Sequence, residues 1–295
     1  MIWRSFVRQP DMARPHICFI QSQSLAWQRP SGAILLLGVE RLKSKPLSDD
    51  DSDGSVTAVL QFAPGYQQQL VLQPNHYCEI LMLQGSLTVM AANVAPTQLT
   101  EHGYARLTGG AVAAAQQINT TAGAVALIML GVGAAHEPII IADSYRLPWL
   151  HGAAGSVTGK PLNAELASKI LYRDSQTGEQ SFLYCAMPQH APPAVMVGKF
   201  THPVVEEIFT LSGSYVFGDV GRMTAGGYCW WREGQWHGPT GSETGYCLFI
   251  RVLGGRLSNQ FSTEPAAFSW HPAYRPALPQ TLRVLATHKT ESIEW

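Results

Sequence analysis

The chain contains one sequence pattern twice, and this internal repeat limits the folds that it can adopt. Residues 44–65 and 168–189 align without gaps, and residues 79–89 match 207–217 with Glu, Ile, Leu, Gly and Ser in register. A repeat that keeps its order over about 110 residues indicates two copies of one structural unit. The 295 residues are enough for two units of about 150 residues each.

Each copy is a series of short segments with the composition of β-strands. AVLQFAP, EILMLQG and AVALIML in the first copy, and SFLYCAM, EEIFTLSG and GYCLFIRV in the second, are rich in β-branched and aromatic residues and are flanked by turn residues. Helical periodicity is nearly absent. Several short strands in each copy predict a jelly roll or small barrel. We therefore predict an all-β chain with an N-terminal extension (1–24) and two tandem barrels (25–145 and 146–295).

The charge content excludes several classes of partner. Twenty basic and 21 acidic side chains give a formal net charge of −1, without a Lys/Arg run. Nucleic acids and anionic membrane surfaces both require clustered positive charge, so we expect neither as a partner. The chain has no apolar run of about 18 residues and no signal-peptide core, and its five cysteines form no CxxC pair. We expect a cytoplasmic protein that binds a small molecule.

Two histidines and a glutamate in the second copy have the spacing of metal ligands. If THPVVEE is extended, His202 and Glu206 lie on one face and Glu207 on the other. His237, about thirty residues later, adds a third ligand. Two His and one carboxylate suit a non-heme Fe(II) oxygenase, and the same set can hold Zn²⁺ with a bound water. The metal-free alternative is a buried carboxylate paired with two imidazoles.

These motifs resemble those of the cupin superfamily. Its first motif is G-x5-H-x-H-x3–4-E-x6-G, and its second is G-x5-P-x-G-x2-H-x3-N. The positions that fit are His202, Glu206 and Gly213 in the first motif, and Gly226, Gly234 and His237 in the second. Three positions depart from the motifs: Phe200 replaces the first His, Arg232 the Pro and Gly241 the Asn. The resemblance therefore implies three of the usual four ligands.

Within the superfamily, HGP and the closing SWHPAYRPALP resemble a bicupin subgroup related to ChrR-type anti-sigma lobes and acetylacetone-cleaving dioxygenases. The resemblance implies two cupin domains and one divalent metal in the C-terminal barrel, either Fe(II) or Zn(II), with Mn or Ni as further alternatives. Because bicupins often pair through exposed strands, it also suggests a homodimer.

The first copy has no metal ligands at the corresponding positions. Pro74 aligns with His202, Cys78 with Glu206, and Ala113 with His237. We therefore predict a degenerate N-terminal barrel without a metal.

Further residues are candidates for the site, each with a plainer alternative. Aromatic side chains around the motifs either line a substrate pocket or pack in the core: Phe200, Trp230, Trp231, Trp236, Tyr184 and Phe249. Glu207 is either salt-bridged or solvated, or is turned inward by a bulge to act as a catalytic base. His190 lies either at the surface or over the barrel mouth as a fourth ligand.

Three functions fit these residues. The first is a metal-dependent dioxygenase that acts on a small enolisable or phenolic substrate. The second is a non-catalytic sensing module that Zn²⁺ stabilises, as in anti-sigma lobes. The third is a metal-dependent isomerase or hydrolase.

Overall fold

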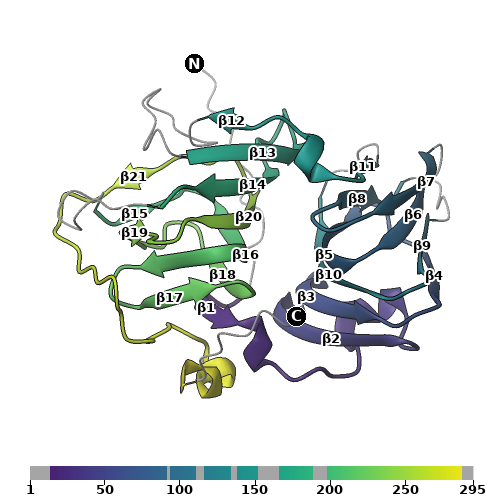
Figure 1. Cartoon of the computed structure of the whole chain (residues 1–295), viewed down its shortest axis with the longest axis horizontal. Helices are drawn as coiled ribbons and strands as arrows, with labels where there is room; N and C mark the ends of the chain where they lie inside the picture. The colour runs from purple at the N-terminus through teal and green to yellow at the C-terminus, as the bar shows by residue number, and fades with distance from the viewer. Residues whose placement is uncertain are drawn as a thin grey trace.

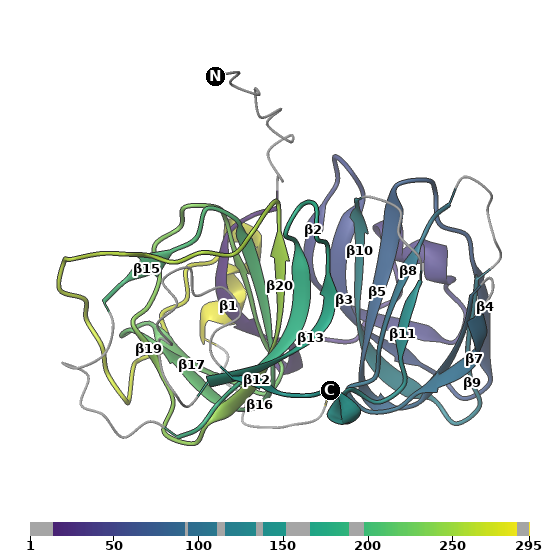
Figure 2. The ribbon, with the colours of Figure 1, turned by 90° about the horizontal axis from the view of Figure 1, so that it is seen from above.

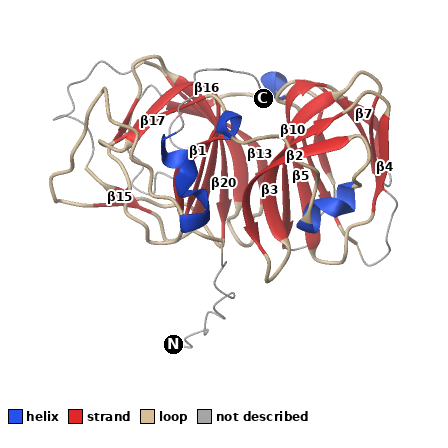
Figure 3. Cartoon of the chain, turned by 90° about the horizontal axis from the view of Figure 1, so that it is seen from below, coloured by secondary structure: helices blue, strands red, loops and turns tan. Residues whose placement is uncertain are grey.

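The computed structural model describes residues 14–91, 94–110, 116–133, 138–151, 166–188, 198–287 and 295. Nearly all regular structure in these residues is antiparallel β-sheet, which confirms the predicted all-β class (Figures 1 and 3). Short 3-10 turns interrupt the sheets: η1 (Ser22–Ser24), η2 (Gly32–Leu37), η3 (Ser144–Arg146) and η5 (Gln280–Thr287). No helix in this part of the chain is long and apolar enough to span a membrane.

The N-terminal lobe consists of a six-stranded and a four-stranded sheet. The six-stranded sheet has the order β11 (Ile139–Ile141), β8 (Tyr104–Thr108), β5 (His76–Gly85), β10 (Ala124–Val132), β3 (Ser55–Phe62) and β2 (Leu42–Asp50). The four-stranded sheet has the order β4 (Tyr66–Leu70), β9 (Gln116–Thr120), β6 (Leu87–Ala91) and β7 (Val94–Leu99). Apolar side chains from both sheets form the interior of this lobe.

The C-terminal lobe repeats this architecture around β16. Its nine-stranded sheet has the order β1 (Ile17–Gln21), β18 (Gly227–Trp231), β16 (Val205–Phe217), β20 (Tyr246–Leu253), β14 (Gln180–Ala186), β13 (Leu166–Arg173) and β12 (Leu150–His151). Two short strands, β17 (Gly221–Thr224) and β19 (Thr240–Gly241), pair with the far end of β16. A separate pair joins β15 (Phe200–Thr201) to β21 (Gln260–Phe261).

Strand β1 connects the start of the chain to the C-terminal lobe. It falls within the predicted N-terminal extension (1–24), yet it pairs with β18, with Ile20 opposite Tyr228. Its five residues are all buried. The extension therefore supplies the edge strand of the nine-stranded sheet, because burying this apolar run requires a sheet edge and β18 provides one.

A hydrophobic core joins the two lobes. Figure 2 shows β2, β3 and β10 of one lobe beside β13 and β20 of the other. Side chains from both lobes pack in this core, among them Leu81 and Leu127 from the first lobe and Phe209 and Phe249 from the second. Burying each such side chain contributes about 1.5–3 kcal/mol relative to leaving it exposed. The large sheet of each lobe thus has one face toward its own interior and one toward the other lobe.

Buried carboxylates lie between the lobes at equivalent places in the repeat. Glu207 of β16 accepts a hydrogen bond from the Thr57 hydroxyl of the N-terminal lobe at 2.5 Å. Glu79 of β5 accepts one from the Ser181 hydroxyl of the C-terminal lobe at 2.7 Å. Arginines complete the arrangement, because Arg251 is ion-paired with Glu207 and Arg106 with Glu79. Each lobe therefore provides a hydroxyl to the carboxylate of the other.

Candidate metal centre

Glu206 lies on the central strand of the C-terminal lobe and faces its interior. It is the second residue of β16, opposite Trp231 of β18 and Val252 of β20. Side chains alternate along a strand, so Ile208 shares its face. Ile208, Trp231 and Val252 all belong to the interior core of this lobe. The carboxylate is therefore held among apolar side chains.

The two histidines near this carboxylate come from two different loops. His202 follows β15 and precedes β16, whereas His237 lies in the loop after β18. Phe200 fixes that loop, because its backbone N–H donates to the His237 carbonyl and its own carbonyl accepts from the His237 N–H, both at 2.9 Å. The loop is thereby tied to the strand that leads to His202.

The three side chains converge closely enough to share one ion. One ligand atom from each of His202, Glu206 and His237 lies within 4.8 Å of the others. The distances from Glu206 Oε2 are 3.5 Å to His202 Nε2 and 3.6 Å to His237 Nε2. All three residues are buried, with exposed fractions of 5%, 6% and 5% in the same order. Among the described residues, no other group of three His, Cys, Asp or Glu side chains has this geometry.

The other ring nitrogens have backbone partners that orient the imidazoles. His202 Nδ1 lies 3.1 Å from the Ser258 carbonyl oxygen, and His237 Nδ1 lies 3.0 Å from that of Gln235. A carbonyl only accepts, so each Nδ1 carries a hydrogen, and in the neutral form of each imidazole Nε2 has a free lone pair. Both Nε2 atoms are buried without a hydrogen-bond partner. Unpaired lone pairs aimed at a common point, with the tautomer fixed from behind, are what a bound metal ion requires.

The electrostatics of the cluster keep the carboxylate ionised. Burial raises the pKa of Glu206, but the charge of His202 and its close contact with the carboxylate, with a smaller contribution from His237, together outweigh burial and lower it below its ordinary value. Burial lowers the pKa of His202, but the charge of Glu206, together with polar contacts to Glu206, Ser258 and Asn259, reverses this, so that the net shift is upward. For His237, burial dominates and lowers the pKa to about 4. At neutral pH the cluster therefore offers a carboxylate and a neutral His237.

Aromatic rings enclose the centre. The Phe200 ring packs edge-on against both imidazoles, with centroid distances of 5.5 Å to His202 and 4.3 Å to His237. Trp231 stacks on His237 at 4.5 Å. Gly238 allows Phe200 this close approach, because a Cβ at Gly238 would lie 2.7 Å from the Phe200 ring, and its φ of 80° suits glycine. Phe200, which stands at the position of the missing first His, thus forms a wall of the site.

The other predicted pocket residues divide between two faces and the surface. Tyr184 packs against the interior core of the C-terminal lobe, as does Trp231. Trp230 and Phe249 instead belong to the core between the lobes, so the structure does not bring them to the site. Trp236 is 46% exposed. His190 lies outside the described residues.

Glu207 also points away from the centre. It belongs to the carboxylate network between the lobes, where Arg251 Nε donates to it at 2.7 Å and the Tyr228 hydroxyl at 2.7 Å. Burial raises the pKa of Glu207, but Arg251 and Arg14 outweigh this and lower it. A regular strand keeps Glu206 and Glu207 on opposite faces, so the structure does not place Glu207 as a catalytic base. It has the salt-bridged role that was the alternative.

The corresponding strand of the N-terminal lobe carries no such cluster among its described residues. Cys78 of β5 lies between Leu107 and Leu130, as Glu206 lies between Trp231 and Val252. It is fully buried in an apolar core, where burial raises the pKa of its thiol to about 12. Ala113, the counterpart of His237, lies outside the described residues.

Sequence reasoning did not find the carbonyls of Ser258 and Gln235, which orient the two imidazoles. Any residue type provides a backbone carbonyl, so these positions leave no signal in the sequence. His16, which packs on Trp231 at a centroid distance of 4.9 Å, also went unnoticed because it precedes β1, far away along the chain.

No protein-family model matches the chain, and no curated protein matches it. Solved structures do. The putative dioxygenase of Nostoc punctiforme has a TM-score of 0.63 at 17% identity, over 85% of this chain and 92% of that one. Protein YlbA from E. coli has a TM-score of 0.57 at 12% identity, over 81% and 91%. Oxalate decarboxylase from Bacillus subtilis has a TM-score of 0.52 at 10% identity, over 83% and 79%.

Each of these structures is matched over most of its length. The chain therefore shares their fold, in agreement with the all-β fold that the cupin resemblance implies. At identities this low the similarity concerns the fold, and the chemistry has to be argued from the residues of the candidate site itself.

Proposed function

We propose that the chain is a bicupin whose C-terminal lobe binds one divalent metal ion through His202, Glu206 and His237 and uses it in a dioxygenase reaction. The observation that carries this proposal is the pair of buried, unpartnered Nε2 atoms that face one oxygen of an ionised carboxylate. Leaving two such nitrogens unpaired costs about 1–3 kcal/mol each. A metal ion between them removes that cost.

The residues fit the donor set of a non-heme iron centre. Two imidazoles and one carboxylate leave coordination positions open for a substrate and dioxygen. When bound, the ion supplies Lewis acidity and a place where both reactants meet. The chain itself holds the two Nδ1–H groups on backbone carbonyls, so both imidazoles keep one tautomer and one orientation through the reaction.

The apolar walls favour a small organic substrate with a chelating end. Phe200 and Trp231 exclude water from the sides of the cluster, which strengthens electrostatic interactions inside it. An enolisable diketone or a catechol offers two oxygens to a metal and a flat carbon skeleton to aromatic rings. We therefore assign the substrate to this class.

The burial of all three ligands also supports a second function, a non-catalytic module ordered by Zn²⁺. Structural zinc sites are closed, whereas catalytic ones keep a position open to water. Exposed fractions of 5–6% are those of a closed site. In this reading the ion fixes the loop of His237 against the sheet and performs no reaction.

Metal analysis followed by oxygen uptake tests the proposal. The full chain, purified without chelators, should contain about one divalent ion, and after anaerobic loading with Fe(II) it should consume O₂ with a member of a panel of diketones and catechols. Glu206→Ala should abolish both properties, while Glu233→Ala, which removes an exposed carboxylate from the neighbouring loop, should leave both unchanged. Stoichiometric zinc without O₂ consumption would support the closed module, and a wild type that binds no divalent metal would contradict both functions.

A further inference from the structure

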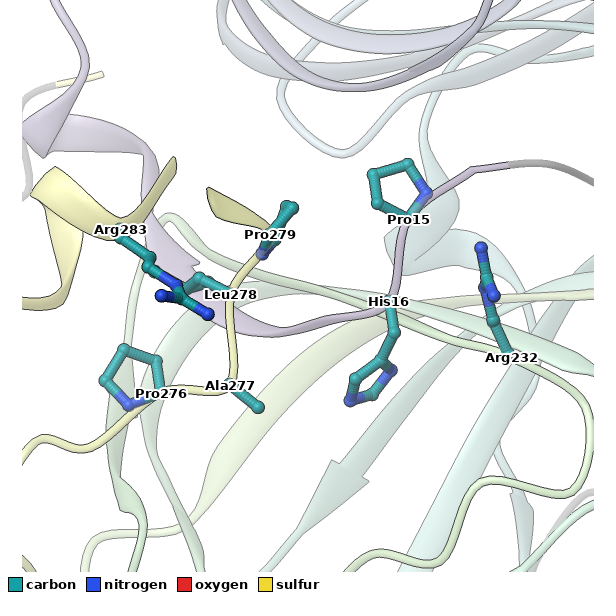
Figure 4. A pocket seen from close by; sticks show the side chains of 8 residues that line it. All are labelled: Pro15, His16, Arg232, Pro276, Ala277, Leu278, Pro279 and Arg283. Atoms are coloured by element: carbon teal, nitrogen blue, oxygen red, sulfur yellow. The ribbon is translucent and has the colours of Figure 1, made fainter. Parts of the chain in front are cut away.

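A cavity opens on the C-terminal lobe, and none of the three metal-site residues lines it. Its volume is about 680 Å³, within the range of small-molecule pockets. Four parts of the chain surround it: Pro15 and His16 before β1, Arg232 after β18, residues 276–279, and Arg283 in η5 (Figure 4). Segments so far apart in the sequence meet here because β1 pairs with β18 and the Ala277 carbonyl accepts from the Cys18 N–H at 2.8 Å.

Two arginines give this cavity a positive charge that is not neutralised within the described chain. Arg232 and Arg283 stand on opposite sides of it in Figure 4. Among the residues that the structure describes, no carboxylate is ion-paired with either one. The Arg232 Nε–H donates to the Arg14 carbonyl at 3.0 Å, which orients the guanidinium. Its remaining N–H groups suit a carboxylate, which a guanidinium binds in a two-pronged geometry.

Between the two arginines the wall is apolar and stiff. Pro276 and Pro279, whose rings fix φ, line one side with Ala277 and Leu278, and Pro15 lies beside His16 on the other (Figure 4). A preformed wall loses little entropy when a ligand binds. A hydrocarbon chain fits against it better than a hydrated phosphate does, because the wall offers contact area rather than hydrogen bonds.

The His16 ring links the lining of the cavity to the metal centre. It packs on Trp231, the ring that in turn stacks on the candidate metal ligand His237. Its Nδ1 is buried and has no hydrogen-bond partner. Trp231 therefore contacts both a residue that lines the cavity, His16, and a candidate metal ligand, His237.

We propose that this cavity binds a small dicarboxylate, with one carboxylate on Arg232, the other on Arg283 and the hydrocarbon spacer against the segment 276–279. This site is additional to the metal centre and does not depend on whether the centre is catalytic. The spacing of the two carboxylates sets the preferred ligand, so affinity should vary with spacer length.

Isothermal titration calorimetry of the full chain with succinate, glutarate and adipate tests the site, with the dimethyl esters and inorganic phosphate as further probes. At least one diacid should bind, more tightly than phosphate, and its neutral ester should not bind. Arg283→Gln should weaken the best diacid by about tenfold or more, since it removes a charged hydrogen-bond partner. Because Arg283 is exposed, this variant tests binding without disturbing the fold.

Two controls locate the binding. Arg275→Gln removes an exposed positive charge next to the lining segment without altering the lining, and should change the affinity less than about twofold. His237→Ala should retain diacid binding, because the proposed site does not use the metal ligands. The proposal is overturned if no diacid binds, if Arg275→Gln weakens binding as much as Arg283→Gln, or if His237→Ala abolishes it.

Discussion

The two lobes share a strand order and differ in what fills them. In both, the central strand lies between the same two neighbours in the repeat, β5 between β8 and β10 and β16 between β18 and β20. At the equivalent interior position the first lobe has Cys78 in an apolar core, and the second has Glu206 with two imidazoles. The fold thus accommodates either an apolar interior or a polar cluster, provided that the charged groups of the cluster are paired with one another.

What the lobes have in common is their junction. Glu79 and Glu207 are equivalent in the repeat, as are Ser181 and Thr57, and each carboxylate receives its hydroxyl from the opposite lobe. Glu79 and Glu207 of the repeated EI…L.GS pattern therefore lie at the contact between the lobes, whereas the residues of the candidate metal site occur in one copy alone. Residues that the two copies share thus hold the lobes together, and residues that differ between the copies form the candidate metal site.

The largest loss of stability should come from placing a carboxylate in the interior of the N-terminal lobe, at the position equivalent to Glu206. Cys78→Glu buries a charge in an apolar core, where Pro74 stands in place of His202, and we expect a loss of about 3–5 kcal/mol in the free energy of unfolding. Chemical denaturation measures this loss. Cys78→Ala, which changes volume but adds no charge, should cost less than half as much. A Cys78→Glu protein as stable as the wild type would mean that the first lobe also tolerates a carboxylate inside.

The next effect concerns metal affinity. His237→Ala removes one of three ligands, and since losing a partner that merely orients a ligand costs about 10–100-fold, losing the ligand should weaken binding by more than about 100-fold. Competition with a metal-sensitive dye measures the affinity. His76→Ala, a histidine change on β5 of the first lobe, is the matched control and should have no effect. Equal losses in both variants would show that the ion does not reside in the C-terminal lobe.

Removing either of the two hydroxyls between the lobes should destabilise the protein by a similar amount. Thr57→Val and Ser181→Ala each remove one hydroxyl donor from a buried carboxylate, and each should lower the free energy of unfolding by about 1.5–3 kcal/mol. Urea denaturation of the two single variants compares them directly. If one variant is strongly destabilised and the other is not, the two carboxylates are not equivalent despite their positions in the repeat.

The smallest effect is the pH dependence of metal binding. A histidine must lose its Nε2 proton to bind a metal; the pKa of His202 is raised above its ordinary value, while that of His237 is about 4. Below the His202 pKa, affinity should fall about tenfold per pH unit, with a slope of one proton rather than two until the pH approaches that of His237. Metal titrations from about pH 5 to 8, the range in which an imidazole titrates, measure the slope. A slope of two would show that both imidazoles titrate together.

Much of the fold can be predicted from the sequence, because both the internal repeat and the alternation of side chains along the strands are clear. The repeat predicts two units, and strand alternation places Glu206 and Glu207 on opposite faces of the sheet. Alternation also predicts that Trp230 and Trp231 face opposite ways, but which of them faces inward depends on the pairing of β18 with β16. That register is set by contacts between distant strands, so local pattern could not assign Trp230 or Phe249 to the junction.

The candidate metal ligands could be predicted from the sequence for a different reason. His202 and Glu206 are close along the chain, and His237 follows a glycine turn with motif spacing. The supporting contacts were not accessible, because the Ser258 and Gln235 carbonyls have no residue-specific signal. Strand β1 was missed because its partner lies some two hundred residues later, and its apolar run is too short to identify its destination.

The pairing of β1 with a strand of the C-terminal lobe affects how the chain folds during its synthesis. Ile17–Gln21 leaves the ribosome before either lobe, whereas its partner β18 emerges only after the whole N-terminal lobe has been synthesised. During that interval these five residues, four of them apolar, have no edge to join. A shortened chain that begins after residue 24 would lack the edge strand of the lobe at the other end of the sequence. The two halves of the repeat are therefore not two separable proteins, and cutting between them divides one sheet.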